Sequence, residues 1–269
     1  MQNKSKELEV AINAALEAGK IVKKHFENGI EKEHKENIHM ADVVTEADRE
    51  SETIIRKIIL ESFPSHSIMG EEGGMIGDKS EYVWHVDPID GTANFASGLP
   101  VFGISIALAR GNELLLGVIY NPIVGDLLYA EKGKGAYLNS KRMQVSDDDV
   151  KKGMYTIGAG RTLEDRKLFK NLYFNLPDKI RYARMFGCTV MELSYVARGS
   201  SEAHIVLGLN SYDFAAGVLL VQESGGKITK LDGSAWAFPE NYFIASNGVF
   251  HDLLIEEVQK QIKNLAPSA

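Results

Sequence analysis

Two aspartates stand close together in the segment Trp84–Thr92, which reads WHVDPIDGT. The apolar residues before Asp87 predict a strand, and Pro88 is expected to end its hydrogen-bond ladder because proline has no N–H to donate. Carboxylates at Asp87 and Asp90 would repel each other unless a cation lay between them. Hard oxygen ligands suit Mg²⁺ or Mn²⁺ better than zinc. The segment therefore predicts a divalent cation site, with a turn capped by both aspartates as the alternative.

The spacing of these aspartates bears on the type of chemistry. In phosphatases that form an aspartyl-phosphate, one residue separates the two aspartates of the motif DxDGT, whereas two residues separate Asp87 from Asp90. That motif also follows the first strand of its chain, and here two predicted helices and a strand come first. The segment therefore disfavours a phospho-enzyme. Gly91 permits close approach of the backbone to a ligand, and Thr92 supplies a hydroxyl.

Three further acidic segments lie at the ends of predicted elements. Glu71 follows a predicted strand in the sequence GEEGG at 70–74, Asp213 opens an apolar helix, and Asp48 belongs to the sequence DVVTEAD at 42–48. Each has an ordinary explanation on its own, as an acidic surface loop, an N-cap or a capping box. Because one chain contains several such acidic segments, we expect them to form one site.

The composition excludes several classes of function. The chain has 269 residues, 44% of them hydrophobic, and a formal net charge of −7, which disfavours binding to nucleic acid polymers or anionic membranes. Cys188 is the only cysteine, so no intrachain disulfide can form, which fits a reducing cytoplasm. Neither a signal peptide nor a stretch long enough to span a membrane is visible. We therefore expect a soluble cytoplasmic protein.

The first half of the chain must position most of these residues. Apolar residues at helical spacing predict a helix over Leu8–Phe26, then a mobile polar loop over Glu27–Ala41, then a capped helix that ends at Phe63–Pro64. Turn signals at Gly111–Asn112 and Lys132–Gly135 predict antiparallel hairpins. The predicted strands are Ser67–Gly70, Tyr82–Val86, Val101–Arg110, Leu114–Tyr120, Asp126–Glu131 and Ala136–Asn139.

The second half alternates strands with helices after a polar seam at Asp147–Asp149. The predicted strands are Met154–Ala159, Ile180–Phe186, His204–Leu207 and Tyr242–Ala245, and the predicted helices are Leu163–Phe174, Val190–Arg198, Phe214–Glu223 and a last one from Val249. Strands grouped after helices predict an α+β layered fold rather than a strict βαβ series.

The order of motifs DVVTxxD, GEE, WxVDPIDGTxNF and YDxAAG, from the first helix to about Gly226, resembles the inositol monophosphatase family. The wider superfamily includes fructose-1,6-bisphosphatases. The resemblance implies an αβαβα sandwich of the sugar-phosphatase type, a homodimer and lithium sensitivity. It implies one unit over residues 1–269, with subdomains of about 1–147 for the metal and phosphate site and 148–269 for the substrate side and the last metal ligand.

The resemblance also implies a ligand set for two or three Mg²⁺ ions, with Mn²⁺ as an alternative. Glu71, Asp87 and the carbonyl of Ile89 would hold one ion, while Asp87, Asp90 and Asp213 would hold a second. A third, weaker ion would lie near Glu71. The catalytic residues would be Asp48, Thr92 and Glu71, acting on a metal-activated water that attacks phosphorus directly and in line, without a covalent intermediate.

The substrate side is implied less fully. The expected contacts are Gly91, Thr92, Arg184, Gly187, Cys188, Thr189 and Asp213. Cys188 is read as a small packing residue, since no motif supports a nucleophile. Animal inositol monophosphatases carry a glutamate seven residues before the last metal aspartate, and Val206 stands at that position. Valine cannot accept hydrogen bonds from substrate hydroxyls.

The sequence thus predicts a phosphoric monoester hydrolase with an open choice of substrate. Inositol monophosphate is the default substrate. Fructose 1,6-bisphosphate, NADP, histidinol phosphate and nucleotide 3'-phosphates are alternatives with the same chemistry. A non-catalytic protein that binds a metal or a metabolite is a remote alternative, because the metal carboxylates and Thr92 are intact.

Overall fold

The structure is a computed structural model that describes residues 4–29, 33–34, 43–78, 80–148, 153–176 and 182–265, with the backbone alone for 33–34 and 43–44. Most of the predicted loop Glu27–Ala41 lies outside these residues, as do Asp42 and Asp149. Where the loop is described, helix α1 extends to Asn28 and strand β1 (Glu33–His34) pairs antiparallel with β2 (Val43–Val44).

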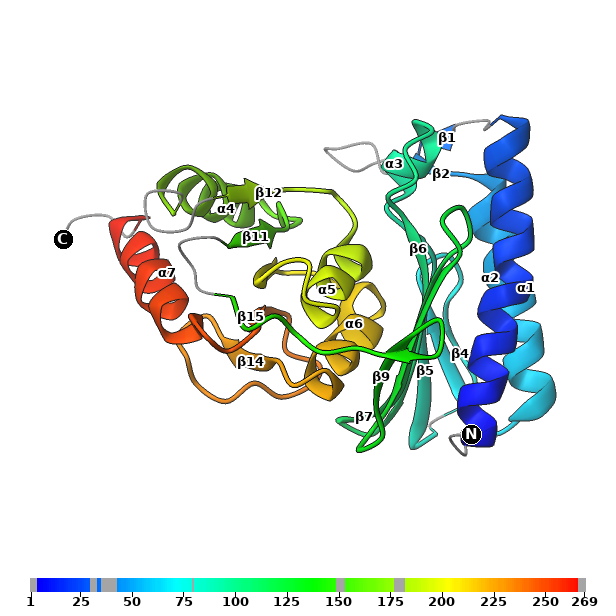
Figure 1. Cartoon of the computed structure of the whole chain (residues 1–269). Coiled ribbons are helices and arrows are strands. Elements are labelled where there is room, and N and C mark those ends of the chain that lie inside the picture. The colour runs from blue at the N-terminus through cyan, green and yellow to red at the C-terminus, as the bar shows by residue number, and fades with distance from the viewer. Residues whose placement is uncertain are drawn as a thin grey trace.

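Helices α1 (Lys6–Asn28) and α2 (Glu46–Ser62) form the first layer. Each buries one apolar stripe, because its apolar residues recur at helical spacing. On α1 the stripe includes Leu8, Ala15 and Val22, and it packs on one face of a large sheet. The two helices lie next to each other along that face (Figure 1).

The second layer is a sheet in which eight strands are ordered among the described residues. Its pairs are antiparallel except for the parallel pair β3 and β5. In spatial order the strands are β10 (Lys141–Arg142), β9 (Gly135–Leu138), β8 (Asp126–Glu131), β7 (Glu113–Asn121), β6 (Gly103–Arg110), β5 (Tyr82–Asp90), β3 (Ser67–Gly70) and β4 (Gly74–Ile76).

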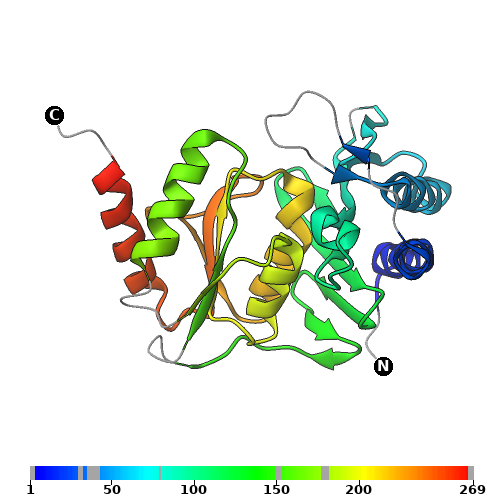
Figure 2. The ribbon, with the colours of Figure 1, turned by 90° about the horizontal axis from the view of Figure 1, so that it is seen from above.

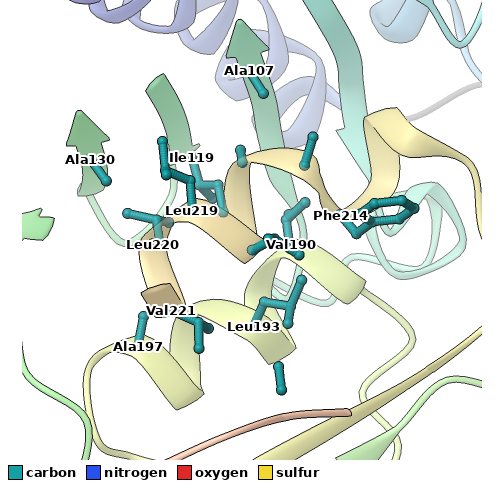
Figure 3. Close-up of a cluster of buried hydrophobic side chains, with 14 of the residues drawn as sticks. Ala107, Ile119, Ala130, Val190, Leu193, Ala197, Phe214, Leu219, Leu220 and Val221 are labelled. Carbon is teal, nitrogen blue, oxygen red and sulfur yellow. The ribbon is translucent and has the colours of Figure 1, made fainter. Parts of the chain in front are cut away.

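Helices α5 (Thr189–Ala197) and α6 (Ser211–Glu223) form the middle layer and are buried on several sides. Their apolar residues do not keep to one stripe, which is typical of a helix enclosed by protein. Figure 3 shows Leu219 of α6 near Ile119 of β7, and Leu193 of α5 on the side of α6 away from the strands, all in one cluster of buried side chains.

A second sheet and two outer helices complete the described molecule (Figure 2). In spatial order its strands are β12 (Tyr182–Arg184), β11 (Met154–Ile157), β13 (Ala203–Leu207), β15 (Tyr242–Ser246) and β14 (Lys227–Lys230). Helices α4 (Leu163–Asn175) and α7 (His251–Leu265) cover its outer face through a separate apolar core. The layers therefore follow the order helix, sheet, helix, sheet, helix, which confirms the α+β sandwich.

The predicted helices and hairpins are confirmed within a few residues, but the expected end of β5 is wrong. The strand continues through Pro88 to Asp90. Its pairing with β6 passes from Asp87↔Ser105 to Asp90↔Gly103, so Pro88 and Ile89 face only Ile104. This β-bulge absorbs the proline, whose missing N–H would otherwise leave a gap in a regular ladder.

Membrane insertion through a helix is not supported within the described ranges. No helix there combines the length and the apolar character needed to cross a bilayer.

Candidate active site

The bulge in β5 shapes the backbone between the two aspartates. The N–H of Ile89 donates to Asp87 Oδ1 at 3.0 Å, and the carbonyl of Ile89 accepts the Thr92 hydroxyl at 2.9 Å. Bulges commonly re-aim side chains beside active sites. Here the bulge turns the Ile89 carbonyl out of the ladder and towards Thr92.

Gly91 then reverses the chain into the short helix α3 (Thr92–Ala96). Its φ of +89° favours glycine, and an added Cβ would come within 3.0 Å of the Cβ of Cys188. The backbone at Gly91 therefore lies close to Cys188, just before α5, and to the carbonyl of Val101. Its close approach to a ligand stays a prediction.

Asp87 and Glu71 come from neighbouring parallel strands. The N–H of Glu71 donates to the carbonyl of Val86 at 3.1 Å, which places Glu71 beside the strand that carries Asp87. Burial, together with the negative charges of Glu71, Asp90 and Asp213, raises the pKa of Asp87 well above its usual range. The neighbouring Glu71 carboxyl group, as a hydrogen-bond partner of Asp87, adds to this rise.

Asp90 is held by the first turn of α5. Its Oδ2 accepts the N–H of Val190 at 2.6 Å, and the Cys188 thiol donates to it at 3.3 Å. Burial raises the pKa of Asp90 to about 7, and the Val190 N–H opposes that rise. Asp90 thus joins the first sheet to the middle layer of helices.

Asp213 lies in the first turn of α6, but it is not the N-cap. Asn210 is the N-cap, and its N–H donates to Asp213 Oδ2 at 2.8 Å. Arg161 also donates to Oδ2, at 3.2 Å. Burial raises the pKa of Asp213 to about 8 against the opposing effect of Arg161. The capping role predicted for Asp213 therefore exists in another form and is combined with a place in the acidic cluster.

Asp48 and Thr92 lie next to each other beside this cluster. Asp48 Oδ2 accepts the N–H and the hydroxyl of Thr45, at 2.8 and 2.6 Å, which completes the predicted capping box at the start of α2. Asp48 Oδ1 lies 3.4 Å from the Thr92 hydroxyl. Burial raises the pKa of Asp48 to about 7. One oxygen is thus fixed, and the other faces Thr92.

The segment Phe186–Thr189 covers one side of the Asp90 carboxylate. Asn94 of α3 donates to the carbonyls of Phe186 and Val101, at 2.7 and 2.8 Å. Cys188 is buried, and burial raises the pKa of its thiol well above the usual range. A thiol of that kind is a poor nucleophile, which fits the packing role expected for Cys188.

Arg184, expected on the substrate side, and Val206, at the position of the glutamate of animal relatives, have the following surroundings. Arg184 is exposed on β12, where its guanidinium donates to the carbonyl of Ala183 and lies over the ring of Tyr182. Val206 is fully buried in the apolar core around α5 and α6. The position that carries a hydroxyl-binding glutamate in animal relatives is therefore part of the core here.

Arg161 is the polar residue of this region that sequence reasoning missed. It follows β11, and its N–H donates to Asp165 Oδ2 within the cap of α4. The sequence signal that could have found Arg161 is a positively charged residue just after a predicted strand. The signal was weak, because only the fold brings Arg161 to Asp213, 52 positions further along the chain.

The donor set fits a hard divalent cation. Asp87 and Asp213 are buried and Asp90 is half-buried. Each has a raised pKa, so the ion pair of Asp213 with Arg161 does not offset the mutual repulsion of the carboxylates. No group of three or more His, Cys, Asp or Glu side chains in the described ranges is already arranged to hold an ion. Arg161 occupies Asp213 Oδ2, an oxygen that a cation bound at this position would need.

Comparison with known proteins agrees with the fold and the motifs. The model of the inositol monophosphatase family matches residues 3–263. A fructose-1,6-bisphosphatase/inositol-1-monophosphatase of Aquifex aeolicus is 34% identical, covering 98% of this chain and 99% of the relative. The Nus factor SuhB of Pseudomonas aeruginosa is 33% identical over 95% of this chain and 96% of its own.

A solved structure of a Thermotoga maritima IMPase superposes with a TM-score of 0.87 and 31% identity, covering 97% of this chain and 99% of the other. Full-length matches of this kind in both sequence and structure leave no part of the fold without a counterpart. The chain belongs to the inositol monophosphatase family, whose members are metal-dependent phosphoric monoester hydrolases.

Proposed function

We propose that this protein hydrolyses a small phosphate monoester with the help of Mg²⁺, with inositol monophosphate as the default substrate. One observation carries the proposal above the others. Four carboxyl groups, at Glu71, Asp87, Asp90 and Asp213, gather at the β5 bulge beside the Asp48–Thr92 pair. Carboxyl groups held this close together repel one another when ionised, and bound cations relieve that repulsion.

For the metal ligands, we propose the set that the family resemblance implies. Glu71, Asp87 and the Ile89 carbonyl would hold one ion, and Asp87, Asp90 and Asp213 a second, with a weaker third ion near Glu71. When bound, such ions make water a stronger nucleophile and offset negative charge on the ester oxygens. Mn²⁺, with the same preference for oxygen ligands, is the expected substitute.

Asp48 and Thr92 are proposed to prepare the attacking water. The Thr92 hydroxyl lies 3.4 Å from Asp48 Oδ1 and donates at 2.9 Å to the Ile89 carbonyl. When that carbonyl holds a metal ion, the hydroxyl proton would turn to Asp48, and the hydroxyl oxygen could accept a hydrogen bond from water. As the water oxygen attacks phosphorus, its proton passes through the hydroxyl to Asp48. The ester oxygen then departs and takes a proton from solvent. A carboxyl with a pKa of about 7 is well matched to that task near neutral pH.

The substrate side is proposed to be the segment Gly187–Thr189 together with the backbone at Gly91 and Thr92. Asp213 and Arg184 complete the proposed contacts. Val206 offers no acceptor for substrate hydroxyls, and Arg161 adds a cation beside Asp213. These features favour recognition through the phosphate over recognition through a pattern of hydroxyls. Fructose 1,6-bisphosphate, NADP, histidinol phosphate and nucleotide 3'-phosphates therefore stay as alternatives.

A substrate panel at fixed Mg²⁺ tests this choice. The expected result is phosphate release from inositol 1-phosphate, with measurable release from at least one other small ester. Strong preference for a non-inositol ester, by about a hundredfold in kcat/KM, would replace the default substrate. Absence of release from every ester would favour a non-catalytic protein that binds a metal or a metabolite.

Finer properties are proposed from the family resemblance. They are a homodimer, a cytoplasmic location, inhibition by lithium, and a division into subdomains of about 1–147 and 148–269. Sedimentation analysis tests the dimer, and limited proteolysis near the Asp147–Asp149 seam tests the division. An absence of lithium inhibition at saturating Mg²⁺ would remove that property without affecting the proposed chemistry.

A further inference from the structure

A buried ion pair on α2 lies directly beneath the loop that carries Glu71. Glu52 and Arg56 are one helical turn apart, and their charged groups are 2.6 Å apart. Their side chains are only 4% and 11% exposed. Charged groups are costly to bury unless their hydrogen-bonding capacity is used, so the partners of this pair reveal what it holds in place.

Its partners are backbone groups of the Glu71 loop. Glu52 accepts the N–H groups of Glu72 and Gly73, both at 2.8 Å, one on each carboxylate oxygen. Arg56 donates to the carbonyl of Gly74 at 3.0 Å. Three successive residues after Glu71 are thereby tied to α2 through charge-assisted hydrogen bonds, which are stronger than neutral ones.

The glycines of the GEEGG sequence are explained by the same contact. A Cβ added at Gly70 would lie 2.4 Å from the Arg56 guanidinium and 2.7 Å from the Glu52 carboxyl group. A Cβ added at Gly73 would lie 2.6 Å from Arg56. The loop therefore closes around the ion pair on both sides of Glu71, and a side chain at either glycine would displace the ion pair or the loop.

Glu71 is thus fixed from two directions. Its own N–H is bound to Val86, one residue before Asp87, and the residues after it are bound to α2. The same helix carries Asp48 one turn before Glu52, so a single rigid element sets both the Asp48 carboxylate and the Glu71 loop. We infer that Glu52 and Arg56 are positioning residues that hold the Glu71 carboxylate in place for the cation, a role that rests on the metal assignment proposed above.

The test compares Glu52→Gln with wild type. The amide can accept only one of the two N–H groups, and Arg56 loses its counter-charge. The dissociation constant for Mn²⁺, measured by calorimetry on metal-free protein, and the Mg²⁺ concentration for half-maximal activity should both rise about tenfold, as for other groups that orient metal ligands. The KM for the ester at saturating Mg²⁺ should change much less. Amide exchange at Glu72 and Gly73 should accelerate.

Two further variants separate positioning from bulk stability. Glu52→Gln combined with Arg56→Met removes both charges, so it should recover thermal stability while the metal constants stay raised. Lys57→Met breaks an exposed pair with Glu61 on the same helix, and it should leave all constants unchanged. Arg56→Lys replaces Glu52→Gln in the test if Glu52→Gln does not fold. It retains the positive charge but loses the guanidinium that donates to the Gly74 carbonyl. The dissociation constant for Mn²⁺ should then rise about threefold, and an unchanged constant would overturn the positioning role.

Glu71→Gln serves as the reference. If Glu71→Gln weakens Mn²⁺ binding and folded Glu52→Gln does not, the positioning role is overturned and the metal assignment stands. If neither variant weakens binding, Glu71 is not a ligand and both proposals are overturned. Parallel weakening in the two variants supports both.

Discussion

Burial decides the behaviour of single residues in this site. Asp48, Asp90 and Asp213 all have a pKa near or above 7 because each carboxyl group is removed from water before any cation is present. The three carboxyl groups differ in their hydrogen-bond partners. Thr45 fixes one oxygen of Asp48, Val190 fixes Asp90, and Arg161 shares Asp213 with Asn210. Similar carboxyl groups are thereby given separate tasks.

Thr92 provides the sharpest prediction at this scale. Thr92→Ala removes the hydroxyl that is proposed to pass the proton from water to Asp48, so kcat should fall by about two to three orders of magnitude, the usual contribution of proton transfer. Thr92→Ser retains the hydroxyl and should stay within about tenfold of wild type. Steady-state kinetics at saturating Mg²⁺ measures both. Equal activity of the alanine and serine variants would exclude Thr92 from the proton path.

Some residues of the candidate site could be predicted from the sequence, and others could not. Glu71, Asp87, Asp90 and Asp213 could be predicted as one group because each follows or begins a predicted element and resembles a known motif. Arg161 could not, since its contact with Asp213 depends on how β11 and α6 meet in space. The support beneath Glu71 was missed for the same reason, because Glu52 and Arg56 appear in the sequence as ordinary charged residues of a helix.

The helices that pack in the hydrophobic core also position residues of the candidate site. Helices α5 and α6 lie between the two sheets, and they carry Val190 and Asp213 into the acidic cluster. Local patterns predicted both helices, as well as the hairpins and the capping box of α2. The edge strands β4 and β14 were not predicted because they are short and lie largely at the surface, so no buried apolar run marks them. Helix α3 has five residues, too few for a helical period.

Leu193 tests the middle layer. It is fully buried on α5 and packs against Gly217 of α6, so Leu193→Ala should reduce the free energy of unfolding by about 2–5 kcal/mol. Urea denaturation measures the change. Leu163→Ala removes an exposed leucine from α4 and should stay within about 0.5 kcal/mol of wild type. Equal effects of the two substitutions would contradict the layer assignment.

At the scale of the whole molecule, the acidic cluster links stability to pH and metal. Asp90 and Asp213 have folded pKa values of about 7 and 8, above the ordinary aspartate value of 3.8. Between these limits the folded chain binds more protons than the unfolded chain. Stability of the metal-free protein from these groups is therefore greatest at low pH and is lost as the pH rises through the folded values.

Thermal unfolding at about pH 6 and about pH 9 measures this linkage. The metal-free protein should lose stability between the two values as the carboxylates charge and repel. Saturating Mg²⁺ should raise the Tm more at the higher pH, because no protons need to be displaced. Asp213→Asn, which lacks one of the carboxyls, should show a shallower loss. A larger Mg²⁺ effect at the lower pH would contradict the charge pattern of the cluster.

Hydrolysis of a phosphate monoester with metal bound at the segment Asp87–Thr92 is the activity proposed for this protein. Phosphate release from inositol 1-phosphate by wild type and Asp90→Asn, each with Mg²⁺ and with a chelator, tests it most directly. Wild type should release phosphate with Mg²⁺ but not with the chelator. In Asp90→Asn the rate of release should fall by at least about a thousandfold, with an unchanged circular dichroism spectrum. Release in the presence of chelator, or full activity of folded Asp90→Asn, would contradict it.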